Sequence, residues 1–145
     1  MKISTKGRYA LRMLSDLAVH QNEGFISLKD VSERQHISKK YLEQIVPLLN
    51  KSGIIKANRG NKGGYMIAGK ASDLSVGTVL RATEGSLAPV ACLDYEPNEC
   101  ERINECATIE MWKGLYKIIS EYLDGITIQD IADKSMSITG DHYCI

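Results

Sequence analysis

Three cysteines lie close together in one acidic stretch of the sequence, ACLDYEPNECERINECATIEMW. Cys92 and Cys100 are separated by seven residues, and Cys100 and Cys106 by five. Structural zinc sites typically place their cysteines in pairs, two to four residues apart, and this stretch contains no such pair. Loosely spaced thiolates suit an iron–sulfur cluster better, because the bridging sulfides enlarge the core that the chain must wrap. We therefore predict that the three cysteines hold such a cluster; the alternative is three unrelated reduced thiols.

The rest of the sequence favours a reducing environment for these thiols. The first residues, MKISTKGRYALRML, lack the apolar core and cleavage site of a secretory signal peptide, and no apolar run is long enough to span a membrane. We therefore expect a cytoplasmic protein without a membrane partner, in which clustered cysteines bind metal or react. Acidic neighbours such as Glu101 and Glu105 disfavour thiolates, so we expect raised pKa values for the cysteines. Cys144, beside the C-terminus, is predicted to be a spare thiol.

The net charge of zero conceals an uneven distribution of charge along the chain. Residues 1–70 carry 13 Lys and Arg against 5 Asp and Glu, whereas residues 71–145 carry 5 against 13. A basic half joined to an acidic half favours a module that binds a polyanion, attached to a part with another role. The alternative is that both halves simply expose solvated charges.

The basic half has the element order of a winged helix. Helical apolar spacing runs through STKGRYALRMLSDLAVH, Ser27 and Asp30 form a capping box before a second short helix, and Ser38 suits the N-cap of a third. Two strand-like runs, IIKAN and GYMIA, then flank the basic, glycine-rich tip RGNKG. We therefore predict a mainly α fold with a small β-hairpin, in which residues 1–70 form a winged helix-turn-helix domain that binds DNA.

The acidic half is predicted to contain a cluster-binding loop at about residues 90–106 and a long helix at about residues 107–124. The apolar positions of that helix form a wide stripe, which a chain of this size cannot cover by itself. We therefore predict a two-fold dimer that reads a palindromic site. The residues predicted to build the dimer are Ile109, Trp112, Leu115, Ile119 and Leu123.

The second helix of a helix-turn-helix places its first turns in the major groove, so its exposed residues are candidates for DNA contacts. We predict base contacts from Lys40, Glu43 and Gln44 in that helix and from Arg59 at the wing tip. The alternative is an ordinary polar surface. Phosphate contacts are predicted for Thr5, Arg8, Tyr9, Ser38, Lys39 and Tyr41.

No sequence motif indicates catalysis. The chain lacks the phosphate-binding loop G-x-x-x-x-G-K-[ST] and the dinucleotide fingerprint G-x-G-x-x-G, and none of its histidines has a paired nucleophile nearby. The GXXG pattern at residues 60–63 matches the loop of the KH RNA-binding module. Its flanks are strand-like rather than helical, so we reject that interpretation and predict that the protein is not an enzyme.

The chain resembles the family of small winged-helix repressors that includes the iron–sulfur cluster regulator IscR, the nitric-oxide-sensing repressor NsrR and the cysteine-metabolism repressor CymR. The resemblance covers nearly the whole chain and rests on KISTKGRYAL, on SERQHIS with YLEQIV, on RGNKGGY at the wing and on the three-cysteine loop running into MWKGL. It implies a homodimer in which the cluster loop of one protomer lies beside the DNA-binding domain of the other.

Among the branches of this family the chain resembles the cluster-binding one, and IscR most closely, because CymR-like members lack the three cysteines. The resemblance implies a repressor that senses iron–sulfur cluster status through a [2Fe–2S] cluster, with [4Fe–4S] as the alternative. Two further functions remain as alternatives: a nitric oxide or redox sensor of the same fold, and a cluster-carrying electron-transfer protein.

The fourth cluster ligand does not carry over from the family. Ile109 stands where IscR has a histidine, and Arg8 and Arg12 stand where other branches have an acid or a histidine. Glu110 is one candidate, because it would share a face with Cys106 if the helix had begun by then. The other candidates are His142, a small thiol and water.

Overall fold

Helices form most of the part of the chain that this computed structural model describes, residues 1–141, and a single two-stranded antiparallel hairpin accompanies them. The predicted class, mainly α with a small β-hairpin in a winged helix-turn-helix arrangement, is confirmed. The α-helices and strands are α1 Thr5–Val19, α2 Leu28–Gln35, α3 Lys39–Lys51, β1 Ile55–Asn58, β2 Gly64–Ile67, α4 Val76–Glu84, α5 Ile109–Asp124 and α6 Ile128–Asp141. Short 3₁₀ turns occur at Gln21–Glu23, Ala71–Asp73, Ala91–Leu93 and Ile103–Glu105.

Serine side chains begin each of the first three helices. Ser4, Ser27 and Ser38 each accept a hydrogen bond from a backbone amide in the first turn of α1, α2 and α3, which satisfies a donor that the helix itself leaves unpaired. The turn between α2 and α3 is short because His36 adopts a left-handed conformation, with φ of 53°. These caps and this turn produce the helix-turn-helix that the sequence predicts.

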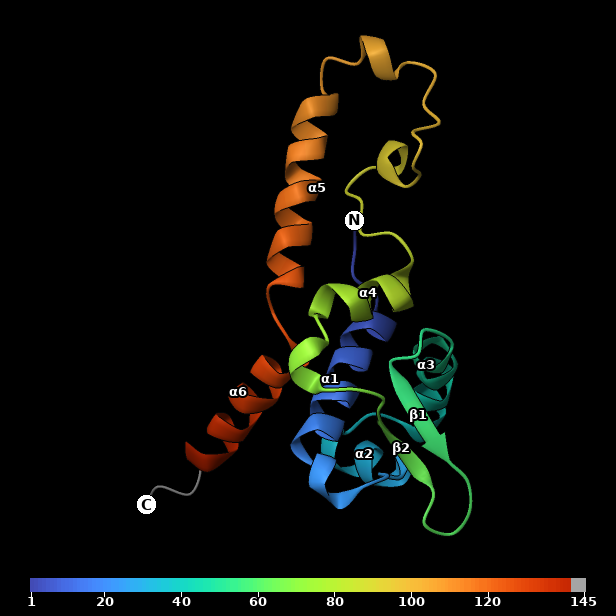
Figure 1. Cartoon of the computed structure of the whole chain (residues 1–145), viewed down its shortest axis with the longest axis vertical. Coiled ribbons are helices and arrows are strands. Elements are labelled where there is room, and N and C mark those ends of the chain that lie inside the picture. The colour runs from blue at the N-terminus through green and yellow to red at the C-terminus, as the bar shows by residue number, and fades with distance from the viewer. Residues whose placement is uncertain (142–145) are drawn as a thin grey trace.

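The hairpin is attached to the connection between α1 and α2. Tyr65 of β2 exchanges backbone hydrogen bonds with Ile26, at 2.8 and 2.9 Å. A side chain at Gly64 would collide with the backbone of Ile26, so glycine permits this close approach. The hairpin is therefore held along the outer edge of β2, next to the turn, and the turn itself extends away from the helices (Figure 1).

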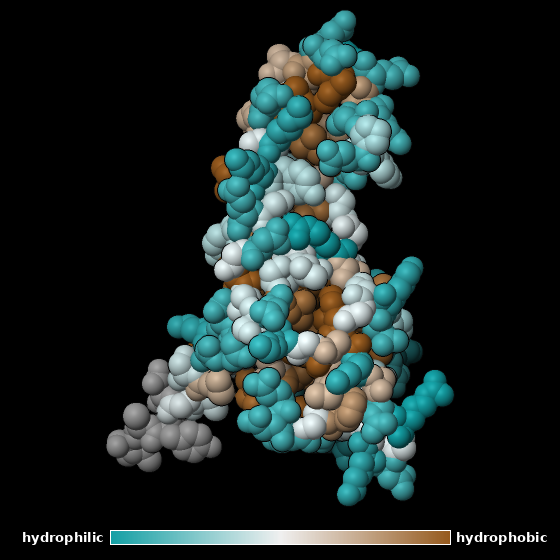
Figure 2. Space-filling view, in the orientation of Figure 1, coloured by the Kyte–Doolittle hydropathy of each residue, from teal (hydrophilic) through white to brown (hydrophobic). Residues whose placement is uncertain are grey.

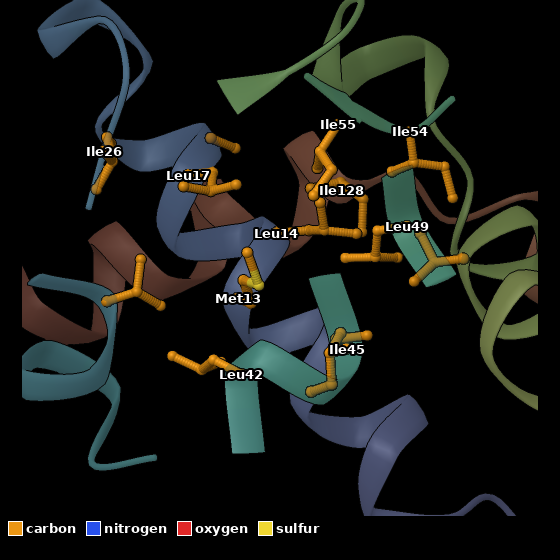
Figure 3. Packing of buried hydrophobic residues seen from close by; sticks show 14 of the residues in the cluster. Met13, Leu14, Leu17, Ile26, Leu42, Ile45, Leu49, Ile54, Ile55 and Ile128 are labelled. Carbon is orange, nitrogen blue, oxygen red and sulfur yellow. The ribbon is translucent and has the colours of Figure 1, made fainter. Parts of the chain in front are cut away.

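The last helix returns to the first half of the chain. A capping box of Thr127 and Asp130, with reciprocal hydrogen bonds of 2.8 and 3.1 Å, begins α6. Ile128 is fully buried in the core that includes Leu14 of α1 and Leu49 of α3 (Figure 3). We call α1, α2, α3, the hairpin and α6 the head. The division of the chain at residue 70 into a DNA-binding part and a part with the cluster loop and the dimer helix stays a prediction.

Helix α4 packs on α1 and α3 and adds Val79 to the core of the head, whereas α5 extends away from the head. Helix α5 begins at Ile109, two residues later than predicted, and projects beyond the head; the chain segment of residues 85–108 runs from the end of α4 to the far end of α5 (Figure 1). We call this segment the cysteine loop; Cys92, Cys100 and Cys106 lie in it. None of the helices in residues 1–141 has the length and apolar character needed to cross a membrane.

Candidate functional site

Helix α3 presents the predicted base-contacting residues to solvent. Lys40, Glu43 and Gln44 are exposed on one face of the helix, as is Lys39 in its first turn. The opposite face, with Leu42 and other apolar residues, is fully buried in the core. The predicted residues are therefore together on one accessible helix face.

The wing tip presents a second group of cations. Arg59 and Lys62 are exposed on the turn between the two strands, and hydrophilic side chains project where this tip lies, at the lower right of Figure 2. Gly60 has φ of 114°, and the amide of Gly63 donates to its carbonyl oxygen at 3.0 Å. Glycine permits this positive φ, which brings the backbone into a tight turn under the two cations.

Some of the residues in α1 and α3 that are predicted to contact phosphates interact with one another. Arg8 donates a hydrogen bond of 3.0 Å to Thr5 at the exposed start of α1. The rings of Tyr9 and Tyr41 meet edge to face, with centroids 5.2 Å apart. Arg12, which the sequence analysis did not assign to DNA, has its guanidinium 5.4 Å from the Tyr9 ring centroid. The two tyrosines thus join α1 to α3.

An ion pair between the buried carboxylate of Asp16 and the exposed Arg34, which the sequence did not predict, joins α1 to α2. Asp16 is 3% exposed and accepts hydrogen bonds from Arg34 at 2.7 and 3.0 Å and from Gln35 at 3.1 Å. The hydrogen bond to Asp16 raises the pKa of Arg34 further above its ordinary value. An acid inside the apolar run from Met13 to Ala18 was the available signal, because a buried carboxylate requires a partner.

The start of α1 is also bound to the residue that precedes the cysteine loop. Glu84, the last residue of α4, accepts hydrogen bonds from the backbone nitrogen and the hydroxyl of Ser4, at 3.2 and 2.7 Å. A side chain at Gly7 would collide with the Glu84 carboxylate, so the small residue permits the contact. This contact connects the cysteine loop to the first turn of α1, where Thr5 and Arg8 lie.

The three cysteines of the cysteine loop are free and half-buried. Within residues 1–141, no three or more His, Cys, Asp or Glu side chains come together as a group able to hold a metal ion. The cysteines thus share one segment, and binding a cluster would require the loop to bring them closer together. In donor chemistry they fit an iron–sulfur cluster, because reduced thiols are its protein ligands.

The expectation of a raised thiol pKa is wrong at Cys106. The pKa of this thiol is lowered. The main causes are hydrogen bonds from the side chain and the backbone of Thr108, and the charge of Arg102 adds to them. The Thr108 hydroxyl lies 3.4 Å from the Cys106 sulfur, so local hydrogen bonding outweighs the more distant carboxylates at this position.

The geometric premise for Glu110 as a ligand is also wrong. Helix α5 starts at Ile109, and Cys106 has an extended backbone with φ of −83° and ψ of 106°. The two residues therefore do not share a helix face, and the carboxylate of Glu110 instead pairs with Lys113 at 3.1 Å. His142 and Cys144 lie outside the described residues.

The exposed apolar stripe of α5 differs from the predicted one. Of the five residues predicted to build a dimer, Ile109 is buried, Leu115 is exposed, and the other three are half-buried. The large apolar residues that α5 does expose are Met111 at 53%, Leu115 at 39%, Ile118 at 65% and Tyr122 at 68%. Apolar residues also reach the surface in the upper part of Figure 2, where α5 and the cysteine loop lie.

Comparison with known sequences identifies a match to the Rrf2 family model, described as an iron-dependent transcriptional regulator, over residues 3–134. The chain is 42% identical over 131 residues to protein rrf2 of Nitratidesulfovibrio vulgaris strain Hildenborough, covering 90% of this chain and 87% of that protein. It is 38% identical over 134 residues to the HTH-type transcriptional regulator IscR of Yersinia pseudotuberculosis, covering 92% and 80%.

Two solved structures are similar in fold to this chain. The structure of CymR, the global cysteine regulator of B. subtilis, gives a TM-score of 0.75 at 34% identity, covering 92% of this chain and 98% of CymR. The structure of T. potens IscR gives a TM-score of 0.73 at 38% identity, covering 93% and 88%.

Proposed function

Because the chain belongs to the Rrf2 family of transcriptional regulators, we propose that it is a repressor that senses iron–sulfur cluster status through a cluster held by Cys92, Cys100 and Cys106. As a member of that family it is a DNA-binding transcription regulator and not an enzyme. The observation that carries the proposal is the presence of three free, half-buried cysteines in one loop of a chain 38% identical to IscR.

The cluster proposal is supported by the chemistry and setting of the cysteine loop. Between Leu87 and Ile109 no residue is buried, so the segment has no core of its own to keep the thiols apart. When bound, an iron–sulfur cluster supplies a centre that oxidants, nitric oxide or iron shortage can destroy. We propose [2Fe–2S] by similarity to IscR; [4Fe–4S] is the alternative, and the fourth ligand remains unassigned.

The proposed DNA-binding surface combines α3, the wing tip and the start of α1. In it Lys40, Glu43, Gln44 and Arg59 contact base edges. The phosphates are contacted by Thr5, Arg8, Tyr9, Ser38, Lys39 and Tyr41. The exposure of the α3 residues and of Arg59 supports the assignment, and the basic charge of residues 1–70 supplies the long-range attraction to DNA.

We propose that the chain forms a homodimer through α5. Met111, Leu115, Ile118 and Tyr122 are spaced four, three and four residues apart, which is the spacing of a seam between two packed helices. A second copy would cover this stripe and place two heads on a palindromic operator. We expect Ile118→Glu to give a monomer in light scattering, whereas Lys117→Glu keeps the dimer; a monomeric wild type at micromolar concentration would refute the proposal.

The proposed route from cluster to DNA passes through Glu84. This residue ends α4, directly before the cysteine loop, and binds Ser4 at the start of α1. A loop that becomes ordered around a cluster can therefore bias the position of Thr5 and Arg8 without moving the core of the head. This would link DNA affinity to cluster occupancy, provided that DNA binds the two states with different affinity.

The direct experiment is anaerobic purification, followed by visible absorbance and by iron and sulfide analysis. We expect Cys92→Ala, Cys100→Ala and Cys106→Ala each to abolish the visible chromophore, and the control Cys144→Ala to keep it. Retention of the chromophore in one of the first three variants, with loss in Cys144→Ala, would show that the ligand assignment is wrong.

A further inference from the structure

The side chain of Asn98 joins the backbone at two of the three cysteines. Its amide nitrogen donates a hydrogen bond to the carbonyl oxygen of Cys92. Its amide oxygen accepts a hydrogen bond of 2.9 Å from the backbone nitrogen of Cys100. A single carboxamide can bind both positions because it carries a donor and an acceptor.

This contact is different from the others in the cysteine loop. Among the described residues, the other hydrogen bonds within residues 85–108 join positions two or three apart. The side chain of Asn98, by contrast, bonds to Cys92, six residues earlier in the chain. Asn98, Cys92 and Cys100 are half-buried, while the residues at 94–97 are exposed. The chain between the two cysteines therefore turns around the Asn98 carboxamide.

We propose that Asn98 is a positioning residue, which sets the relative placement of Cys92 and Cys100 before a cluster is bound. The inference rests on the proposed function, because it assigns Asn98 a role toward the proposed ligands. Seven residues separate the two cysteines, and bringing the ends of such a segment together costs conformational entropy. The two hydrogen bonds of Asn98 offset that cost in the cluster-free protein, so fewer conformations have to be lost on binding.

The amide group of the side chain matters at this position. A carboxylate here could accept the hydrogen bond of the Cys100 amide, but it has no hydrogen to donate to the carbonyl oxygen of Cys92. Asparagine holds the backbone at both positions. Asn98→Asp therefore tests the chemistry of the contact: it keeps an acceptor for Cys100 but places a carboxylate against the carbonyl oxygen of Cys92.

Three variants define the experiment. Asn98→Ala removes both hydrogen bonds, and Asn98→Asp removes the one to Cys92. Asn104→Ala is the matched control, because Asn104 is an exposed asparagine of the same loop whose side chain makes no hydrogen bond to another described residue. All three should fold, since the loop between Leu87 and Ile109 contains no buried residue.

The first measurement follows loss of the cluster from anaerobically reconstituted protein challenged with an iron chelator. Residues that orient metal ligands change metal affinity about 10- to 100-fold when mutated. We expect cluster loss to be about 10-fold faster in Asn98→Ala and Asn98→Asp, and unchanged in Asn104→Ala. Equal rates in all four proteins would overturn the role of Asn98.

The second measurement needs no cluster. In iron-free protein carrying Cys106→Ala and Cys144→Ala, only Cys92 and Cys100 remain, and dibromobimane becomes fluorescent as it bridges two neighbouring thiols. We expect bridging to slow several-fold in Asn98→Ala and Asn98→Asp but not in Asn104→Ala; equal bridging rates overturn the inference. A wild type that takes up no iron and sulfide would overturn the proposed function, and the bridging rates would still decide the placement by Asn98.

Discussion

The head and the cysteine loop are stabilised in different ways. The head has a continuous apolar core to which α1, α2, α3, β1 and α6 all contribute, and the Asp16–Arg34 pair adds a polar contact between α1 and α2. The cysteine loop has no buried residue between Leu87 and Ile109, and few of its hydrogen bonds reach beyond the next turn. The head is thus a preformed structure, whereas the loop depends on additional interactions, as ligand-binding segments commonly do. A ligand that binds only the ordered loop would stabilise it by its binding free energy.

The largest loss of stability is expected when a core side chain is removed from α6. Ile128→Ala should lower the free energy of unfolding by about 2–5 kcal/mol, the range for large-to-small changes in a core, because Ile128 is fully buried. Ile138→Ala, in the same helix at a position 54% exposed, should change it by less than about 0.5 kcal/mol. Urea denaturation of both variants measures this, and similar stabilities would mean that α6 does not belong to the head.

The Asp16–Arg34 ion pair should have the next largest effect. Asp16→Asn removes the charge that Arg34 and Gln35 bind, and we expect a loss of about 2–3 kcal/mol in unfolding free energy, below the roughly 3–5 kcal/mol for breaking a fully buried pair, because the Arg34 side chain is 33% exposed. Glu33→Gln is the control, because Glu33 is exposed and its nearest cation, Lys29, is 4.0 Å away. A loss no larger than that of Glu33→Gln would mean that the ion pair does not stabilise the head.

Measurements of DNA affinity test whether the exposed surface of α3 and the wing tip binds DNA. Arg59→Ala should weaken binding to a specific operator by about 1–3 kcal/mol, the range for a good base contact, while Lys39→Ala should weaken all sequences similarly. Affinity should fall steeply with salt, because DNA binding releases counterions from the phosphates. Fluorescence anisotropy with specific and random duplexes at several salt concentrations measures both effects. An affinity that does not change with salt would contradict the assignment of this surface.

The smallest effect is expected at the junction between α4 and α5. Arg81 binds Asp124 at 2.7 and 2.9 Å and lowers the pKa of that carboxyl group. A carboxyl group with a lowered folded-state pKa contributes stability above its unfolded pKa, and the contribution is lost as the pH falls through the folded value. Asp124→Asn should therefore cost less than about 1 kcal/mol at pH 7.

The pH dependence provides the control for this junction. The difference between wild type and Asp124→Asn should shrink as the pH falls below 4, the region of ordinary aspartate pKa values. Thermal unfolding at a series of pH values measures it. A difference that persists in full at low pH would mean that the ion pair does not stabilise the junction.

The parts of the head that depend on local chemistry could be predicted from the sequence. The capping residues Ser27 and Ser38, the apolar spacing of α1 and α3 and the glycine-rich tip each act over a few residues. The Asp16–Arg34 pair and the burial of Ile128 could not be predicted in the same way. Both depend on contacts between segments distant in the chain, which periodicity does not encode.

The differences at α5 have a local cause. Apolar periodicity predicted an interface on Ile109, Trp112, Leu115, Ile119 and Leu123, but it does not reveal which part of a broad apolar surface the chain itself covers. Leu123 packs against a small apolar cluster of Val76, Leu80 and Leu87, which leaves the face of Ile118 exposed. The start of the helix at Ile109, rather than two residues earlier, likewise removed the basis for Glu110 as a ligand.

We propose that the cysteine loop becomes ordered around a cluster while the head stays unchanged. Amide hydrogen exchange of the protein, compared with and without anaerobic reconstitution, measures this difference. We expect peptides covering residues 85–108 to gain protection together with bound iron and sulfide, while peptides from α3 and from the core of α1 exchange at the same rate in both forms. Loop peptides that exchange equally in both forms, despite bound iron and sulfide, would contradict it.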